Sequence, residues 1–163
     1  MADWTPDTHN TTKFTEPIWI VHTDGAWGSM GAGIAAILTS LSGIKLTYAA
    51  RLEFQCTNNS TEYEAIILAL SKLCALSVRR AIIKTDSQVT SGHIEKSFKA
   101  RDPKLQKYLH TVHKIKGFFL GITTKPIPRS ENSEADELAK AMAQGITLPS
   151  EVFYEVIGQP SLE

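Results

Sequence analysis

The sequence lacks the features that would direct a protein into a membrane or a secretory pathway. Its two cysteines, Cys56 and Cys74, cannot build the disulfide framework of a small secreted domain, and we expect both to be packing residues rather than metal ligands. There is no run of eighteen apolar residues and no basic, apolar leader, so neither membrane insertion nor export is predicted. We therefore expect an intracellular, soluble protein with no membrane partner.

A net charge is also lacking, because 17 basic residues balance 17 acidic residues. This balance implies no global attraction to nucleic acid, so any such attraction must come from a local patch. Between His93 and Lys116 the sequence has seven basic residues and two acidic ones. The basic residues are Lys96, Lys99, Arg101, Lys104, Lys107, Lys114 and Lys116. They form either a phosphate-binding surface or an ordinary solvated helical face.

The chain is long enough for one domain with a proper core, since 42% of its 163 residues are hydrophobic. Residues 1–16 are polar, rich in threonine and without periodicity, which predicts a flexible leader. We expect the domain itself to span residues 17–145. Residues 146–163 contain two prolines and a glycine and are expected to form a tail or linker, with Val152–Ile157 as its candidate strand.

Apolar runs predict five strands in the domain. Residues 18–24 are apolar on both alternating faces, which is typical of a central strand covered on both sides. Residues 32–38 and 44–54 follow after turns and predict two antiparallel neighbours. Residues 81–86 repeat the first design, an apolar run that ends in an aspartate, and residues 122–127 supply a fifth strand. The glycines after the first strand lack the Gly-Lys-Ser/Thr ending of a phosphate loop, so a hairpin turn is the better interpretation.

Helical patterns fill the rest of the domain. The first helix follows a polar turn, where Asn59 and Glu62 look like an N-cap and its returning acid. Residues 88–98 and 103–118 predict two more helices, and Asn132 is expected to cap a last helix that runs to about Gly145. The order β-β-β-α-β-α-α-β-α predicts an α/β fold with a five-stranded mixed sheet, three antiparallel strands followed by parallel ones, flanked by helices.

Four carboxylates from distant parts of this order are predicted to converge. Right-handed crossover rules place the strand that ends at Asp86 beside the strand that ends at Asp24. Glu62 enters from the same end, on the first turn of its helix, and Asp136 lies in the opening turns of the last helix. Clustered carboxylates repel one another without cations, so the cluster implies bound metal, and an all-oxygen ligand set favours Mg²⁺ or Mn²⁺. Taken alone, Glu62 could merely complete a capping box.

Four short motifs resemble those of the type 1 ribonucleases H, in the retroelement and archaeal-like branch. They are Thr-Asp-Gly at 23–25, Thr-Asn-Asn-x-x-Glu at 57–62, Thr-Asp-Ser at 85–87 and Asn-x-x-Ala-Asp-Glu-Leu-Ala at 132–139. The resemblance spans about residues 18–145 and implies the ribonuclease H-like fold. The sequence of residues 127–136 is especially similar to ribonuclease H domains of plant long-terminal-repeat retrotransposon polyproteins, and residues 148–161 resemble the segment beyond such a domain.

The resemblance implies an enzyme that cleaves the RNA strand of RNA/DNA hybrids, leaving 5′-phosphate and 3′-hydroxyl ends. Asp24, Glu62, Asp86 and Asp136 would hold two Mg²⁺ ions, which Mn²⁺ could replace. Contacts to the hybrid would come from residues beside these acids and from the basic region. They are Gly25, Thr57, Asn58, Asn59, Ser87, Lys99, Arg101, Lys104 and Asn132. Asn58 and Asn59 would reach base edges and 2′-hydroxyls in the minor groove, unless they serve only the helix cap.

One departure from the best-known cellular members concerns a loop histidine ten residues before the last aspartate. Pro126 stands at that position, and Arg129 is the ionisable side chain near enough to replace the histidine at the site. Two alternatives to the hybrid nuclease stay open: a catalytically idle hybrid-binding or connection module, and a DNA-acting nuclease of the same fold. The resemblance further implies reverse transcriptase and integrase domains as polyprotein partners, an isolated domain that is monomeric, and a place in the cytoplasm, a virus-like particle or the nucleus.

Overall fold

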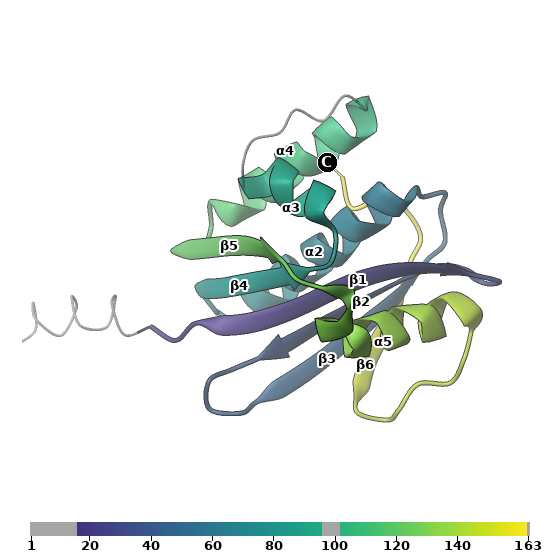
Figure 1. Ribbon diagram of the computed structural model, residues 1–163, viewed down its shortest axis with the longest axis horizontal. Coiled ribbons are helices and arrows are strands. Elements are labelled where there is room, and N and C mark those ends of the chain that lie inside the picture. Colours follow the sequence, from purple (N-terminus) through teal and green to yellow (C-terminus); the bar gives the residue numbers. More distant parts are fainter. Residues whose placement is uncertain (1–15, 96–101, 163) are drawn as a thin grey trace, which may run out of the picture.

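A six-stranded mixed sheet forms the centre of the computed structural model, which describes residues 16–95 and 102–162 (Figure 1). The strand order is β5-β4-β1-β2-β3-β6. The strands are β1 Trp19–Gly28, β2 Gly31–Thr39, β3 Lys45–Leu52, β4 Arg80–Thr85, β5 Gly121–Pro126 and β6 Val152–Ile157. The predicted α/β class is confirmed, but the sheet has six strands rather than five because the candidate strand in the tail pairs in parallel with β3.

Pairing around β1 follows the predicted crossover rules. β2 runs antiparallel to β1, with Asp24 opposite Ala35, and β4 runs parallel to β1, with Thr23 opposite Thr85. β1 continues four residues beyond the predicted end at Asp24, because its hairpin with β2 closes only at Gly28 and Gly31. The expectation that Asp24 ends its strand is therefore wrong, and its carboxylate projects from the middle of a strand.

Helices cover both faces of the sheet (Figure 1). α2 Asn58–Ala75, α3 Gln88–Glu95 and α4 Pro103–Lys116 lie on one face, and α5 Ser133–Gln144 lies on the other. β2 serves both layers because its side chains alternate: Ile34 packs in the larger core with α2, whereas Ala35 packs with α5. None of the helices among the described residues is long and apolar enough to cross a membrane.

α5 approaches the sheet closely because glycines leave room for it. A β-carbon added at Gly28 would lie 2.5 Å from the carbonyl oxygen of Ala143, and one at Gly33 would lie 2.7 Å from the backbone nitrogen of the same residue. Small alanines on α5 complete this contact. The helix that carries Asp136 in its first turn is thereby packed closely against β1 and β2.

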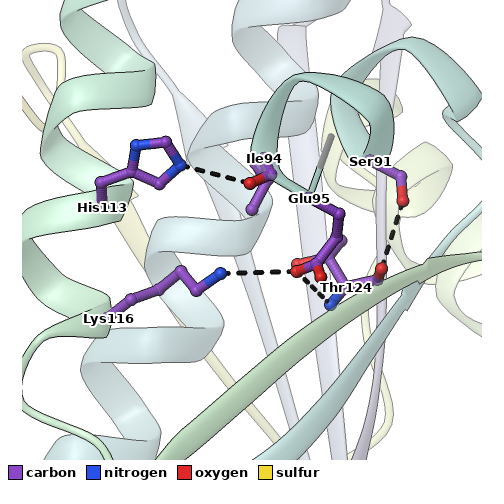
Figure 2. Close-up of polar contacts among 6 residues, drawn as sticks. All are labelled: Ser91, Ile94, Glu95, His113, Lys116 and Thr124. Carbon is purple, nitrogen blue, oxygen red and sulfur yellow. Dashed lines mark hydrogen bonds and ion pairs between the residues drawn. The ribbon is translucent and has the colours of Figure 1, made fainter. Parts of the chain in front are cut away.

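The outer edge of β5 is hydrogen-bonded to α3, which in turn contacts α4 (Figure 2). Ser91 donates a hydrogen bond to the Thr124 carbonyl at 3.3 Å, and the Thr124 N–H donates to Glu95 at 2.9 Å. Lys116 of α4 pairs with the same Glu95 carboxylate at 3.4 Å. Lys116, one of the seven basic residues between His93 and Lys116, is therefore engaged in a contact between α4 and α3. α3 is described only to Glu95, so the end predicted for it at residue 98 lies outside the described part of the chain.

Candidate active site

Three carboxylates meet at one end of α2, beside the adjacent strands β1 and β4. Asp24 projects from β1, Asp86 directly follows β4, and Glu62 lies near the start of α2. One oxygen from each lies within 4.8 Å of the others, close enough for all three to touch a single cation. The parallel pairing of β1 with β4 brings the two aspartates together, as the crossover rule predicted.

The position of Glu62 depends on a helix cap that differs from the predicted one. Thr57 is the N-cap: its Oγ1 accepts from the Ser60 N–H at 3.1 Å, and the Ser60 hydroxyl accepts from the Thr57 N–H at 2.8 Å. The expectation that Asn59 caps the helix with Glu62 as its partner is wrong, because α2 begins two residues earlier. Glu62 consequently lies beyond the first turn and is released from capping.

Burial and mutual repulsion both favour the protonated acids. Desolvation, followed by the charge of Asp86, raises the pKa of Asp24 to about 7. Desolvation, followed by the charges of Asp24 and Asp86, raises the pKa of Glu62 to about 9. One oxygen of Asp24 and one of Glu62 are buried without a hydrogen-bond partner among the described residues. Unpaired buried carboxylate oxygens beside further acids are a fit for a divalent cation, which would supply the missing partner.

Asp136 stands slightly apart from these three acids. It lines the same cleft from the first turn of α5, and its charge also raises the pKa of Asp24. Its carboxylate pairs with Lys140, four residues further along α5, at 2.9 Å. It is absent from the tight group of three, so the structure gathers three of the four predicted ligands around one point and leaves the fourth at the edge.

Arg129 lies in a short 3₁₀ turn, Arg129–Glu131, just before α5. Its guanidinium Nε is 3.9 Å from Asp86 Oδ2, and its side chain is 85% exposed. An ion pair this exposed and this long is weak. The side chain is therefore free to move toward a ligand in the cleft.

The cleft around the acids has a volume of about 340 Å³. Four of the residues predicted to contact substrate line it: Gly25, Asn58, Asn59 and Ser87. The sequence analysis missed three further lining residues, Ala26, Trp27 and Lys140. Trp27 is 46% exposed, which is unusual for a large aromatic side chain in a strand. Its position three residues after Asp24 was the signal from which its place in the cleft could have been predicted.

The other predicted substrate residues lie elsewhere. Thr57 caps α2, and Lys104 is exposed on the first turn of α4, outside the cleft lining. Asn132 is 1% exposed and donates its amide to the Thr23 carbonyl at 2.9 Å, which ties the start of α5 to β1 beside Asp24. It is the N-cap of α5, as predicted, but its side chain makes no capping bond. Lys99 and Arg101 fall outside the described residues.

Comparison with known proteins identifies the family. The family model described as reverse transcriptase-like matches residues 22–142. The chain is similar to LC11-RNase H1, a compost metagenome protein solved in complex with an RNA/DNA hybrid, at 30% identity and a TM-score of 0.67, over 75% of this chain and 94% of that one. It shares its fold with RNase H1 of Halobacterium salinarum, at 24% identity and a TM-score of 0.68, over 77% of this chain and 96% of that one. The chain belongs to the type 1 ribonuclease H family and is a ribonuclease H.

Proposed function

We propose that this protein is an endoribonuclease that hydrolyses the RNA strand of RNA/DNA hybrids, leaving 5′-phosphate and 3′-hydroxyl ends. The observation that carries the proposal is the group of Asp24, Glu62 and Asp86, whose oxygens lie within 4.8 Å of one another in an open cleft. The hybrid bound to the similar LC11-RNase H1 supports the choice of substrate.

The acids are assigned to metal binding. Asp24, Glu62 and Asp86 would hold Mg²⁺, or Mn²⁺ in its place, and Asp136 would complete the ligand set from the α5 side. Two such ions, when bound, supply a nucleophilic water at neutral pH and neutralise the charge of the departing 3′ oxygen. The raised pKa values of Asp24 and Glu62 are consistent with this assignment, because a cation would favour the charged forms that burial and repulsion disfavour.

Other cleft residues would hold and orient the nucleic acid. Asn58 and Asn59 begin α2 beside Glu62 and line the cleft, so their amides can donate to base edges and 2′-hydroxyls in the minor groove. Arg129 is exposed beside Asp86 and would bind a phosphate near the cut. It cannot shuttle protons near neutral pH, since a guanidinium stays charged, so its part would be to bind phosphate and help the product leave.

Two alternatives are less well supported. A catalytically idle connection module would be expected to have lost an acid, whereas all four stand around this cleft. A nuclease acting on duplex DNA would have no use for two amides that can read 2′-hydroxyls. We propose that the activity serves reverse transcription of a retroelement, alongside reverse transcriptase and integrase domains, because the sequence of residues 127–136 resembles that of retrotransposon ribonuclease H domains.

The test is cleavage of three duplexes of one sequence, RNA/DNA, RNA/RNA and DNA/DNA, with each strand labelled in turn. We expect Mg²⁺-dependent cutting confined to the RNA strand of the hybrid. A ligase should rejoin the products, because it joins a 5′-phosphate to a 3′-hydroxyl, and removal of the 5′-phosphate should prevent this. Equal cutting of DNA/DNA would favour the DNA-acting alternative. Tight hybrid binding without cutting would favour the idle module.

A further inference from the structure

The segment from residue 146 to residue 162, here called the C-terminal arm, lies beyond the family match, which ends at residue 142. It is nevertheless built into the fold. β6 pairs with all but two residues of β3, and the Glu53 N–H extends this ladder by donating to the Ile157 carbonyl at 2.9 Å. The arm is an addition to the family domain, and its contacts indicate what it does.

The first part of the arm contacts β3 and the C-terminal half of α2. Phe153 stacks on Tyr48 of β3, with ring centroids 5.4 Å apart. Lys72 of α2 lies 5.3 Å from the centre of the Tyr48 ring and 3.7 Å from the Glu155 carboxylate. Each of these exposed contacts is weak, but together they align β6 with the C-terminal half of α2.

The last part of the arm reaches a buried carboxylate near the other end of α2. Glu64 is 1% exposed, and its Oε2 accepts hydrogen bonds from the Tyr108 hydroxyl at 2.5 Å and from the Ser161 N–H at 2.8 Å. Leu162 packs against the main core beside it. A buried carboxylate is costly unless it is hydrogen-bonded, and Glu64 Oε1 already lacks a partner among the described residues. Losing the Ser161 donor would leave Glu64 with a single hydrogen bond.

Three consecutive side chains tie this part of α2 to three different neighbours. Glu62 faces the cleft, the Tyr63 hydroxyl bonds to His93 of α3 at 3.0 Å, and Glu64 binds α4 and the arm. A movement of the α2 backbone that brings Glu64 toward another donor would turn or tilt the same helical segment. The Glu62 carboxylate would move with it.

We infer that the C-terminal arm is a positioning element of the active site: the Ser161 N–H, acting through Glu64, fixes the start of α2 and therefore the placement of Glu62. The role goes beyond the family domain, and it rests on the proposed function only for its metal and activity readouts. The arm thereby makes hybrid cleavage dependent on a segment that lies outside the lining of the cleft.

A matched pair of variants tests this inference. Ser161→Pro removes the main-chain donor, whereas Ser161→Ala removes the hydroxyl and keeps the N–H. At a temperature where circular dichroism shows both variants folded, we expect Ser161→Pro to weaken Mn²⁺ binding, measured by calorimetry, on the order of tenfold. The hybrid cleavage rate at limiting Mg²⁺ should fall in parallel and recover at high Mg²⁺. Ser161→Ala should match the wild type in both measurements, because its hydrogen bond to Glu64 is intact.

Unchanged Mn²⁺ affinity in folded Ser161→Pro would overturn the inference, since the arm would then serve stability alone. If Ser161→Pro does not fold, amide hydrogen exchange on the wild-type protein decides: the Ser161 amide should be protected as strongly as the amides of α2, and unprotected exchange would refute the contact. If the wild type neither binds Mn²⁺ nor cuts hybrids, the proposed function fails separately. In that case faster exchange in α2 of Ser161→Pro than of Ser161→Ala still supports the arm's role, and equal exchange contradicts it.

Discussion

Asp24 and Glu62 bind protons more tightly in the folded protein than in the unfolded chain. Their pKa values are raised from ordinary values of 3.8 and 4.5 to about 7 and about 9 by burial and neighbouring acids. Near neutral pH and without metal, these two carboxyl groups therefore hold protons in the folded protein that they would release in the unfolded chain. The stability that these two groups contribute is complete below about pH 4 and is lost as the pH rises through 7 and on toward 9.

This linkage predicts how a neutral substitute behaves in a chelating buffer. Glu62→Gln should gain stability relative to the wild type as the pH rises, by about 1 to 3 kcal/mol between about pH 5 and about pH 8. Urea unfolding of both proteins at each pH measures the difference, and added Mg²⁺ should restore the wild type. A difference that stays constant with pH would mean that Glu62 does not carry the raised pKa.

Arg129 offers a second prediction at this scale. Since its ion pair with Asp86 is long and exposed, Arg129→Ala should leave the unfolding temperature nearly unchanged. If it binds a phosphate, the same change should lower turnover on the hybrid well below wild type without abolishing it, and Arg129→Lys should recover only part. Steady-state cleavage and metal affinity measured on one preparation separate the possibilities. Wild-type turnover with Mg²⁺ binding at least as tight would assign Arg129 only to neutralising the acids.

Residue identity allowed the acids to be predicted but not all of their surroundings. Asp24 and Asp86 follow the same kind of apolar run, so their pairing could be expected from topology. Lys140 carries no such signal, because a lysine four residues after an acid on a helix is a common surface pair. Its place beside Asp136 in the cleft emerges only from the packing of α5 against the sheet.

At the scale of elements, two residues at the start of α2 have different roles: Thr57 stabilises the helix as its N-cap, and Asn59 lines the cleft. Thr57→Ala removes the side-chain oxygen that accepts from the Ser60 N–H and should cost about 1 kcal/mol in urea unfolding. Asn59→Ala should cost little stability, because Asn59 makes no capping bond, but should raise the KM for the hybrid. The opposite pattern, with Asn59 stabilising and Thr57 neutral, would restore the cap that the sequence suggested.

The α4 helix divides its basic residues between two tasks. Lys116 pairs with Glu95 (Figure 2), whereas Lys104 and Lys107 are exposed. If the exposed pair binds phosphates, replacing both with alanine should flatten the log-log salt dependence of hybrid binding by about 0.9 for each lost contact. Lys116→Ala is the matched control and should lower stability while leaving the slope unchanged. Equal slopes in all three proteins would make this an ordinary solvated face.

Element order was predictable because the periodicities are strong, but element ends were not. β1 extends past Asp24 because its partner β2 continues, and a run of residues 25–28 with three small side chains gives no strand signal of its own. Thr57 and Asn59 were both possible N-caps of α2 by residue type. Thr57 is the N-cap because it exchanges two hydrogen bonds with Ser60, and the sequence pattern does not reveal these contacts.

On the scale of the whole molecule, the sheet gathers distant residues at one end. Asp24, Glu62, Asp86 and Asp136 come from β1, α2, the end of β4 and α5, and only the order β4-β1-β2 together with helices on both faces brings them around one cleft. No pattern in the sequence identifies a partner for the strand at 152–157, because the pairing of the edge strand β6 depends on β3, which lies far away in the chain. The strand itself was predicted, but its place at the edge of the sheet and the contacts of the arm emerge only from the structure.

The central claim, that these carboxylates hold the metal that cuts the RNA strand, is tested most directly by the rate of hybrid cleavage as a function of Mg²⁺ concentration. The wild type should cut with a rate that rises more steeply than first order at low Mg²⁺, as two ions require, and should be inactive in excess chelator. Asp24→Asn and Asp86→Asn should bind Mg²⁺ weakly and leave the RNA strand intact at every concentration, while metal-free stability stays level or rises. Cleavage by folded Asp24→Asn at ordinary Mg²⁺, or by the wild type in excess chelator, would contradict the account.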